Sequence, residues 1–249
     1  MITDWYDVET EPIVSVKNFY GEPRHIVDVC LIIFSKEIYA HLIHTYECEE
    51  IGVLTACNDD IRIYKMNYKG REIAFYLTGV GSAVASTLCY ETSWVTGARK
   101  FVMFGSCGSL DRDKTDGKFI VPKESYRGDG CSHYYAPPGD YITVKNSARL
   151  CEIFEQLGVP YVVGRVWTTD SMLRETVGLV NKRKAEGCIA VEMELAGVQA
   201  VCDFYGLELY NFLEAGDVLD AGGYEVEGLY GANHDLGKLY VALETALKL

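Results

Sequence analysis

The sequence predicts an α/β fold: a single domain over residues 1–249 in which a central mixed β-sheet is flanked by helices on both faces. Short runs rich in β-branched residues alternate along the chain with stretches of helical periodicity, which is the pattern of α/β proteins. Two of these runs, 61–68 and 72–78, are joined by Lys69-Gly70-Arg71 and have the pattern of a β-hairpin. No polar linker or internal repeat divides the chain. Residues 1–24 are predicted to be an N-terminal extension packed on the domain.

The individual elements follow from the apolar patterning. Residues 27–34 form an apolar run interrupted only by Asp28, which is typical of a buried strand. Apolar residues at helical spacing predict helices over 82–96 and 194–205, and a C-terminal helix with an apolar stripe from Leu239 to Leu247. The predicted strands are 27–34, 61–68, 72–78, 100–104, 117–121, 161–167, 188–191 and 208–212.

Composition excludes several classes of partner. The chain has 23 Lys plus Arg against 36 Asp plus Glu, a formal net charge of −13, which argues against binding nucleic acid through its phosphate backbone. The longest apolar run near the amino terminus is far shorter than the roughly 20 residues of a membrane helix, and no basic segment of a secretory signal precedes it. Nine cysteines without a Cys-x-x-Cys pair indicate a reducing compartment. We therefore expect a cytoplasmic protein without a membrane partner.

In a predominantly parallel sheet, the ligand crevice lies at the carboxyl ends of the strands. That rule points to five segments, each of which follows a predicted strand: 34–35, 78–82, 104–109, 168–174 and 215–217.

Two of these segments are rich in glycine. Gly79 and Gly81 stand between a strand and a helix, where backbone N–H groups can face an anion such as phosphate, although ordinary turn glycines would look the same. In Gly105-Ser106-Cys107-Gly108-Ser109 two hydroxyls and a thiol accompany the glycines. Because no histidine stands in a recognisable partner motif, packing or ligand contact is the better interpretation of Cys107 than nucleophilic catalysis.

Acidic residues mark two further positions. Glu192 and Glu194 bracket Met193 where a predicted strand passes into a helix. A carboxylate there can accept hydrogen bonds from both hydroxyls of a sugar, although acids at a helix start are also favoured by the helix dipole alone. Asp217 is a candidate proton donor if burial raises its pKa, and it is equally compatible with ordinary loop chemistry. The five histidines show no metal-ligand spacing, so no metal is predicted.

Taken together, these segments resemble the nucleoside phosphorylase family, which includes purine nucleoside phosphorylases, uridine phosphorylases and adenosylhomocysteine nucleosidases. The resemblance spans roughly residues 27–219. Its most specific stretch is Val191-Glu192-Met193-Glu194-Leu195-Ala196-Gly197, which matches the family's V-E-M-E-x-A signature. Further matches, in the same order along the chain, are Leu77-Thr78-Gly79-Val80-Gly81, Phe104-Gly105-Ser106-Cys107-Gly108, Tyr134-Tyr135-Ala136-Pro137-Pro138 and Trp167-Thr168-Thr169-Asp170.

The resemblance implies a role for each matching residue. Glu194 would bind the ribose hydroxyls, with Met193 against the sugar and Glu192 nearby. Ser106 would contact phosphate, together with the glycine pair Gly79 and Gly81. The base pocket would be lined by Cys107, Gly108 and Met172, the last at a position where relatives often place a stacking aromatic. Asp217 falls where purine-specific members hold the acid that protonates the leaving base.

The implied reaction is the reversible phosphorolysis of a ribonucleoside, with a purine favoured, to the free base and ribose 1-phosphate. Inorganic phosphate would be a co-substrate, and no cofactor is expected. Uridine phosphorylase activity is an alternative. Members of the family usually assemble as homodimers or homohexamers, so a homo-oligomer is also expected.

One departure from the family pattern leaves the nucleophile open. Family phosphorylases hold phosphate with arginines, one in the first turn and one just before the Gly-Ser-Cys-Gly segment. Here the first turn reads Ile33-Phe34-Ser35-Lys36-Glu37 and the second position is Met103. Other basic residues, such as Lys36, Arg62, Arg174 or one from a neighbouring subunit, would have to substitute. Otherwise water replaces phosphate, as in the family's nucleosidases, which use a glutamate near the position of Glu37.

Overall fold

One mixed sheet dominates the architecture. The computed structural model describes residues 4–57, 59–220 and 223–249, and within them eleven strands join in a single sheet. The α/β class and the mixed sheet predicted from the sequence are confirmed. The strands are β1 (Val29–Ile33), β2 (Cys48–Thr55), β3 (Asp60–Tyr68), β4 (Arg71–Leu77), β5 (Lys100–Ser109), β6 (Phe119–Gly128), β7 (Tyr141–Thr143), β8 (Tyr161–Thr169), β9 (Cys188–Glu192), β10 (Glu208–Asp220) and β11 (Gly223–Glu225).

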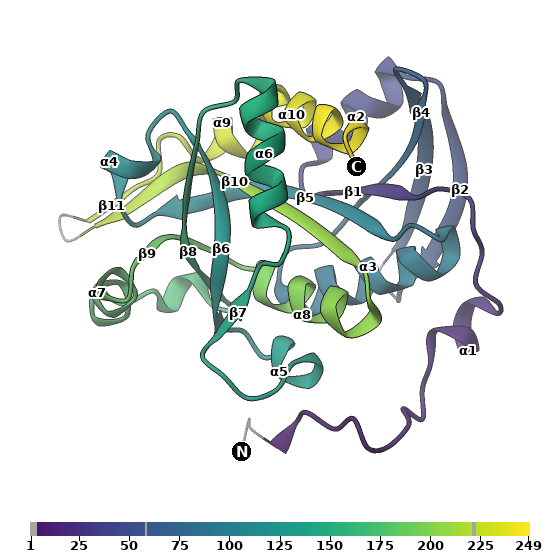
Figure 1. The fold of residues 1–249 in the computed structure, drawn as a ribbon, viewed down its shortest axis with the longest axis horizontal. Helices are drawn as coiled ribbons and strands as arrows, with labels where there is room; N and C mark the ends of the chain where they lie inside the picture. Colours follow the sequence, from purple (N-terminus) through teal and green to yellow (C-terminus); the bar gives the residue numbers. More distant parts are fainter. Residues whose placement is uncertain (1–3, 58, 221–222) are drawn as a thin grey trace.

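Helices lie on either side of this sheet (Figure 1). The α-helices are α1 (Val16–Tyr20), α2 (Lys36–Thr45), α3 (Ser82–Thr96), α4 (Arg112–Thr115), α5 (Ser132–Tyr135), α6 (Ser147–Leu157), α7 (Val177–Ala185), α8 (Leu195–Tyr205), α9 (Leu229–His234) and α10 (Leu236–Leu247). A short 3-10 helix, η2 (Met172–Arg174), follows β8.

The strand order gives the sheet two parts. The neighbours run β11-β10-β6-β8-β9-β5-β1-β4-β3-β2, so β5 lies near the middle. In addition, β10 pairs in parallel with β5. The strands β5, β10, β6, β8 and β9 therefore form a closed circuit of pairings, and β1, β4, β3 and β2 extend from it as an open sheet. The predicted hairpin is the antiparallel pair β3 and β4.

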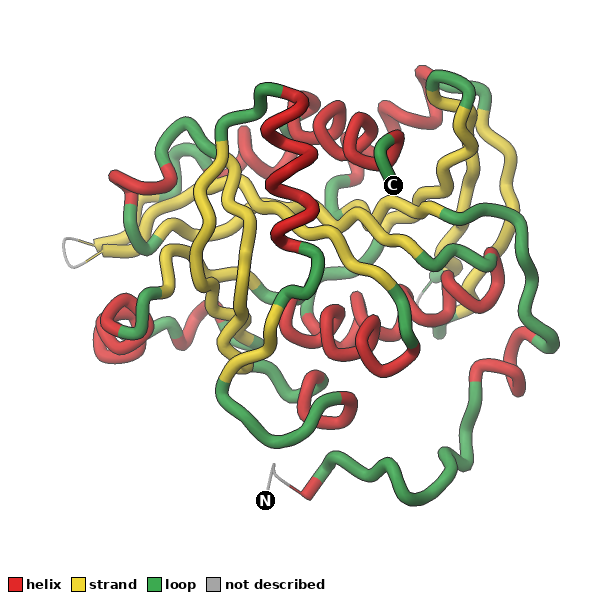
Figure 2. Tube along the Cα trace, in the orientation of Figure 1, coloured by secondary structure: helices red, strands yellow, loops and turns green. Residues whose placement is uncertain are grey.

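Alternate residues of the central strands point into two separate cores, because successive side chains of a strand face opposite sides of the sheet. Cys30 and Ile32 of β1 pack with residues of α3 and α8. Val29, Leu31 and Ile33 pack with residues of α2, α6 and α10. Figure 2 shows the strands in yellow between helices in red above and below.

Helix α8 packs closely against α3, which fixes the start of α8 beside the sheet. A Cβ atom at Gly197 would lie 2.0 Å from Ser82 Oγ and 2.8 Å from Ser86 Oγ. Only glycine allows this approach of the two helices, because any side chain would collide with the serine hydroxyls. The segment before α8, which holds Glu192 and Glu194, is thereby held over the carboxyl end of the sheet.

The two strands that carry the predicted site residues are longer than the sequence indicated. The predicted strands 100–104 and 208–212 end where β5 and β10 continue to Ser109 and Asp220. The two strands remain paired as far as Val218 opposite Ser109, with one irregularity between Ala215 and Asp217. The glycines that follow residues 104 and 212 suggested that the strands end there. They lie inside β5 and β10, because each of these strands completes the hydrogen bonds of the other. The predicted elements also did not include β2, α6 and α7.

Residues 4–24 run along the surface of the molecule (Figure 1). The Trp5 ring stacks on Tyr134 of α5, and the Trp94 indole of α3 donates to the Gly21 carbonyl at 2.9 Å. Residues 1–3 of the predicted extension lie outside the described part of the chain, and its domain boundaries stay a prediction.

Candidate active site

A cavity of about 540 Å³ opens at the carboxyl ends of the central strands. All five segments that the crevice rule selected contribute residues to it, and so do the β9–α8 junction, β10, α9 and α10. The lining residues used below are Ser35, Val80, Met103, Ser106, Cys107, Gly108, Met172, Glu175, Glu192, Met193, Glu194, Asn211, Asp217, Tyr224, Asn233, His234 and Lys238.

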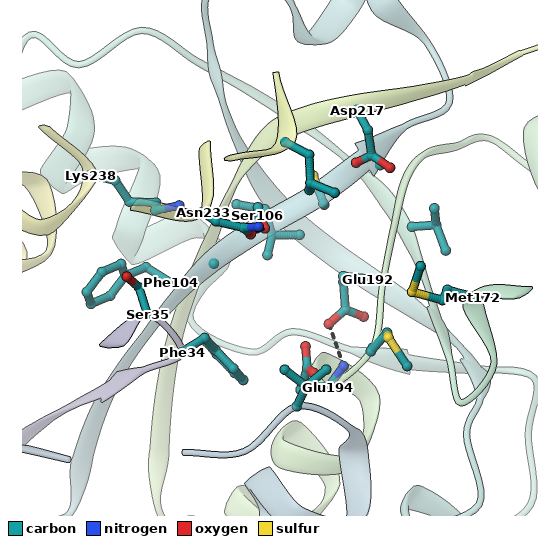
Figure 3. A pocket seen from close by; sticks show the side chains of 18 of the residues that line it. Phe34, Ser35, Phe104, Ser106, Met172, Glu192, Glu194, Asp217, Asn233 and Lys238 are labelled. Carbon is teal, nitrogen blue, oxygen red and sulfur yellow. Dashed lines mark hydrogen bonds between the residues drawn. The ribbon is translucent and has the colours of Figure 1, made fainter. Parts of the chain in front are cut away.

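Glu194 lies on one side of this cavity (Figure 3). It precedes the first residue of α8, is 9% exposed, and accepts a hydrogen bond from the Gly81 N–H at 2.6 Å through Oε1. Gly81 has φ 105°, which a residue with a side chain rarely adopts, and it caps the start of α3. No ion pair engages Glu194 within the described residues. The backbone N–H groups of Gly81 and Met193 are thus its partners within the described residues, and its carboxylate faces the cavity.

Glu192 is held differently, although it lines the same cavity. Its Oε2 accepts the backbone N–H groups of Glu194 at 2.8 Å and Leu195 at 2.7 Å, and its Oε1 accepts the Thr168 hydroxyl. These bonds satisfy donors at the start of α8 that have no partner within the helix. Glu192 therefore acts as a fixed acceptor that orients the strand–helix junction.

Burial raises the pKa of both carboxyls, and the nearby Glu194 charge raises the pKa of Glu192 further. Because the two groups lie close together in a low-dielectric setting, the ionisation of one disfavours that of the other.

Asp217 lies on β10 on a different side of the cavity (Figure 3). Burial raises the pKa of its carboxyl, and a hydrogen bond with the Tyr224 hydroxyl partly opposes that shift. Glu175, which follows η2, faces the same side, and burial together with the Asp217 charge raises the pKa of Glu175 to about 7. A Cβ atom at Gly108 would lie 3.6 Å from Asp217 Oδ1 and 2.4 Å from a Leu219 methyl group. The missing side chain thus keeps open the space beside the Asp217 carboxyl.

Three other predicted site residues line the cavity, and their hydrogen-bond partners do not indicate a catalytic role. Met193 lies beside Glu194, and Met172 is 53% exposed at the mouth. Cys107 is buried, its Sγ contacts the Glu214 carbonyl at 3.6 Å, and burial raises the pKa of its thiol well above the usual value. A neutral buried thiol is a poor nucleophile, so Cys107 forms part of the wall.

The end of the cavity opposite Met172 is polar and carries a buried cation (Figure 3). Ser106 donates to Asn233 Oδ1, and Ser35 Oγ lies 2.7 Å from His234 Nδ1. Ser35 also caps α2 by accepting the Ile38 N–H at 3.2 Å. Lys238 of α10 completes this group and is 1% exposed.

Several sequence candidates lie elsewhere. Gly79 and Gly81 are not among the lining residues, although Val80 between them is, and the Gly81 N–H is taken by Glu194. Arg62 of β3 forms an ion pair at 2.6 Å with Glu50 of the neighbouring strand β2 and does not line the cavity. Lys36 and Arg174 do not line the cavity either, and within the described chain no arginine does.

Sequence reasoning missed a group of lining residues that come from the last third of the chain and from the strand interiors. Glu175, Asn211, Tyr224, Asn233, His234 and Lys238 stand in no motif. The one available signal was the lysine directly before the apolar stripe of the C-terminal helix, which is indistinguishable in sequence from a solvated lysine.

Among the described residues no group of three or more His, Cys, Asp or Glu side chains is placed to hold a metal ion. The same residues contain no helix with the length and apolar character needed to cross a membrane.

Comparison with known proteins agrees with this geometry. The sequence profile of the phosphorylase superfamily matches residues 28–227. Over 158 residues the chain is 25% identical to proteins named purine nucleoside phosphorylase DeoD-type from Bacillus cereus and Bacillus thuringiensis. These matches cover 62% of this chain and 67% of each relative. The match over most of the chain, together with a cavity lined by the V-E-M-E and Gly-Ser-Cys-Gly segments, shows that this protein belongs to the nucleoside phosphorylase family of the phosphorylase superfamily.

Proposed function

We propose that the protein cleaves the N-glycosidic bond of a purine ribonucleoside by phosphorolysis, giving the free base and ribose 1-phosphate. The observation that carries the proposal is that one cavity brings together Glu194, Asp217 and Ser106, which come from three separate segments of the chain. In Figure 3 the acids lie at two sides of the cavity and Ser106 at a third. This arrangement supports a site with separate places for sugar, base and anion.

The chemistry follows from the groups at each place. Glu194 accepts hydrogen bonds from the ribose hydroxyls, with Met193 against the sugar. The base lies between Met172, Gly108 and Asp217, whose raised pKa favours the protonated acid. As the C1′–N9 bond breaks, its electron pair moves into the purine, which takes a proton from Asp217. A phosphate oxygen then forms the new bond to C1′, where positive charge has developed.

The proposal includes a homo-oligomer. Met172 and Leu173 are exposed at the cavity mouth, where a second subunit could cover them.

The test is to incubate the pure protein with inosine, adenosine, guanosine and uridine, each with and without phosphate, and to measure free base and ribose 1-phosphate. We expect phosphate-dependent release of purine bases. Release from uridine alone would move the specificity to pyrimidines, and no base release from any substrate would contradict the proposal.

Hydrolysis is the second candidate, and one observation favours it: within the described residues no arginine lines the cavity to hold phosphate. A nucleosidase would release the same base at equal rates with and without phosphate and would form ribose, not ribose 1-phosphate. The same incubation therefore separates the two reactions.

A further inference from the structure

The polar end of the cavity contains a lysine whose hydrogen-bonding capacity is only partly used. Lys238 Nζ donates to the Ala232 carbonyl and lies 3.4 Å from Glu214 Oε2. An ammonium group carries three hydrogens, and the third has no partner within the described residues. Figure 3 shows the end of this side chain directed towards Asn233 and Ser106.

A further buried polar atom of the cavity wall is unsatisfied. Asn211 Nδ2 donates to the Met103 carbonyl at 3.0 Å, but Asn211 Oδ1 has no hydrogen-bond partner, although the residue is 1% exposed and lines the cavity. Unpaired polar atoms inside a protein are costly and mark places where a ligand or water completes the bonding.

The free hydrogen-bond donors at the polar end of the cavity suit an anion. Lys238 offers an ammonium hydrogen, and the Asn233 amide nitrogen has no partner among the described residues because Ser106 uses only the amide oxygen. Hydrogen phosphate has three oxygens that accept hydrogen bonds, which suits the Lys238 ammonium and the Asn233 amide. The start of α2 at Ser35 adds the positive end of a ten-residue helix.

We propose that Lys238 is the cation that binds inorganic phosphate in this cavity, with Ser35, Ser106 and Asn233 beside it, in place of the arginines that the chain lacks. This proposal rests on the phosphorolytic function above and names the group that holds its nucleophile.

Glu214 limits the strength of this site. Its carboxylate lies beside Lys238 and offsets part of the ammonium charge that phosphate would otherwise meet. Loss of Lys238 should therefore weaken phosphate binding, and loss of the Glu214 charge should strengthen it. A purely structural ion pair would behave differently, because loss of either partner would then act only through stability.

The experiment measures phosphate binding by calorimetry, together with KM values for phosphate and for the nucleoside. Lys238→Met should weaken phosphate binding by about tenfold or more, because a charge-assisted bond is lost, and leave the nucleoside KM within about twofold. Glu214→Gln should tighten phosphate binding several-fold. Lys65→Met is the matched control: it removes a lysine paired with Glu72 at 2.8 Å on the outer hairpin and should change neither constant.

A third variant covers the case in which Lys238→Met fails to fold. The double change Lys238→Met with Glu214→Gln removes the buried ammonium together with its half-buried partner, a replacement that proteins commonly tolerate. This variant should bind phosphate as weakly as Lys238→Met alone. Circular dichroism confirms that each variant is folded.

Three results would overturn the inference. The first is an unchanged phosphate affinity in the folded variants that lack Lys238. The second is a phosphate affinity that Glu214→Gln weakens as much as Lys238→Met does. The third is no binding of phosphate to the unmodified protein. Phosphate-dependent base release with an unchanged phosphate KM in those variants would remove the role of Lys238 and leave the proposed function standing. A rate of base release that does not depend on phosphate would instead contradict phosphorolysis as the function. Calorimetry would still decide whether Lys238 binds phosphate.

Discussion

The acidic sides of the cavity and its polar end are built in different ways. Glu192 and Glu194 are separated only by Met193 and are fixed by backbone N–H groups of their own helix start and of Gly81. Lys238, Ser106 and Ser35 come from α10, β5 and the start of α2. The first arrangement is centred on one strand–helix junction, to which Gly81 and Thr168 add hydrogen bonds from elsewhere in the chain, whereas the second joins side chains of three separate elements. The comparison teaches that the two glutamates belong to a local sequence motif, whereas the side chains of the anion end meet only through the assembly of distant elements.

The largest expected effect is a loss of turnover when the base side of the cavity is changed and the anion end is left intact. Asp217→Asn should slow purine nucleosides by roughly 100-fold or more, because the departing base loses its proton donor, and should leave phosphate binding unchanged. Comparing kcat for a natural purine nucleoside with that for a substrate with a good leaving group checks this, since the second needs no proton. Equal slowing of both substrates would contradict the role of Asp217 as the acid.

Glu194→Ala should reduce kcat/KM by roughly tenfold to 100-fold, because the ribose hydroxyls lose a charged acceptor. A 2′-deoxyribonucleoside serves as the control substrate: it makes fewer hydrogen bonds to Glu194 and should lose less. The free energy of unfolding of this variant should change little, because Gly81, whose N–H donates to Glu194, is only half-buried at a helix start and its N–H can bond to water instead. Unchanged kinetics for the ribonucleoside would contradict the sugar-binding role.

Glu192→Ala sharpens the contrast between the two neighbouring acids. This variant leaves two N–H groups at the start of α8 and the Thr168 hydroxyl without their acceptor, so the free energy of unfolding should fall by roughly 2 kcal/mol or more. Urea denaturation measures it, with Glu194→Ala as the matched variant. If Glu194→Ala were the more destabilising of the two, the assignment of a structural role to Glu192 would be wrong.

The smallest expected effect is on the pH dependence of stability. Burial raises the folded-state pKa of Glu192 and Glu194, and burial with the Asp217 charge raises that of Glu175 to about 7 from 4.5. The folded state therefore holds protons that the unfolded chain has lost, and stability should decline as the pH rises from about 4.5 through about 7. Thermal unfolding should occur at a higher temperature at about pH 5.5 than at about pH 8.

A matched variant tests the origin of that decline. Glu175→Gln should flatten part of it, because the group that titrates is removed. An equal slope in the variant and the unmodified protein would exclude Glu175 as a source.

Much of the acidic side could be predicted from the sequence because its signal is local. The strand–helix junction around Glu192 and Glu194 appears as an apolar run followed by helical spacing. Asp217 was placed correctly at the carboxyl end of the sheet, although inside β10 and not in a loop after it. The strand lengths were missed because β5 and β10 stabilise each other's extensions, and strand pairing between distant segments leaves no trace in either segment alone.

The sequence by itself determined the class of fold, the hairpin, the helix that begins after Glu194, and the family to which the chain belongs. These features depend on periodicity and on short motifs, in which the interacting groups are a few residues apart. Only the tertiary structure decided that Lys238 is buried in the cavity wall beside Glu214, and that the Gly81 N–H donates to Glu194. Side chains far apart in the sequence meet only when the packing of whole helices against the sheet brings them together, and the free energy of that packing is shared among all the core residues.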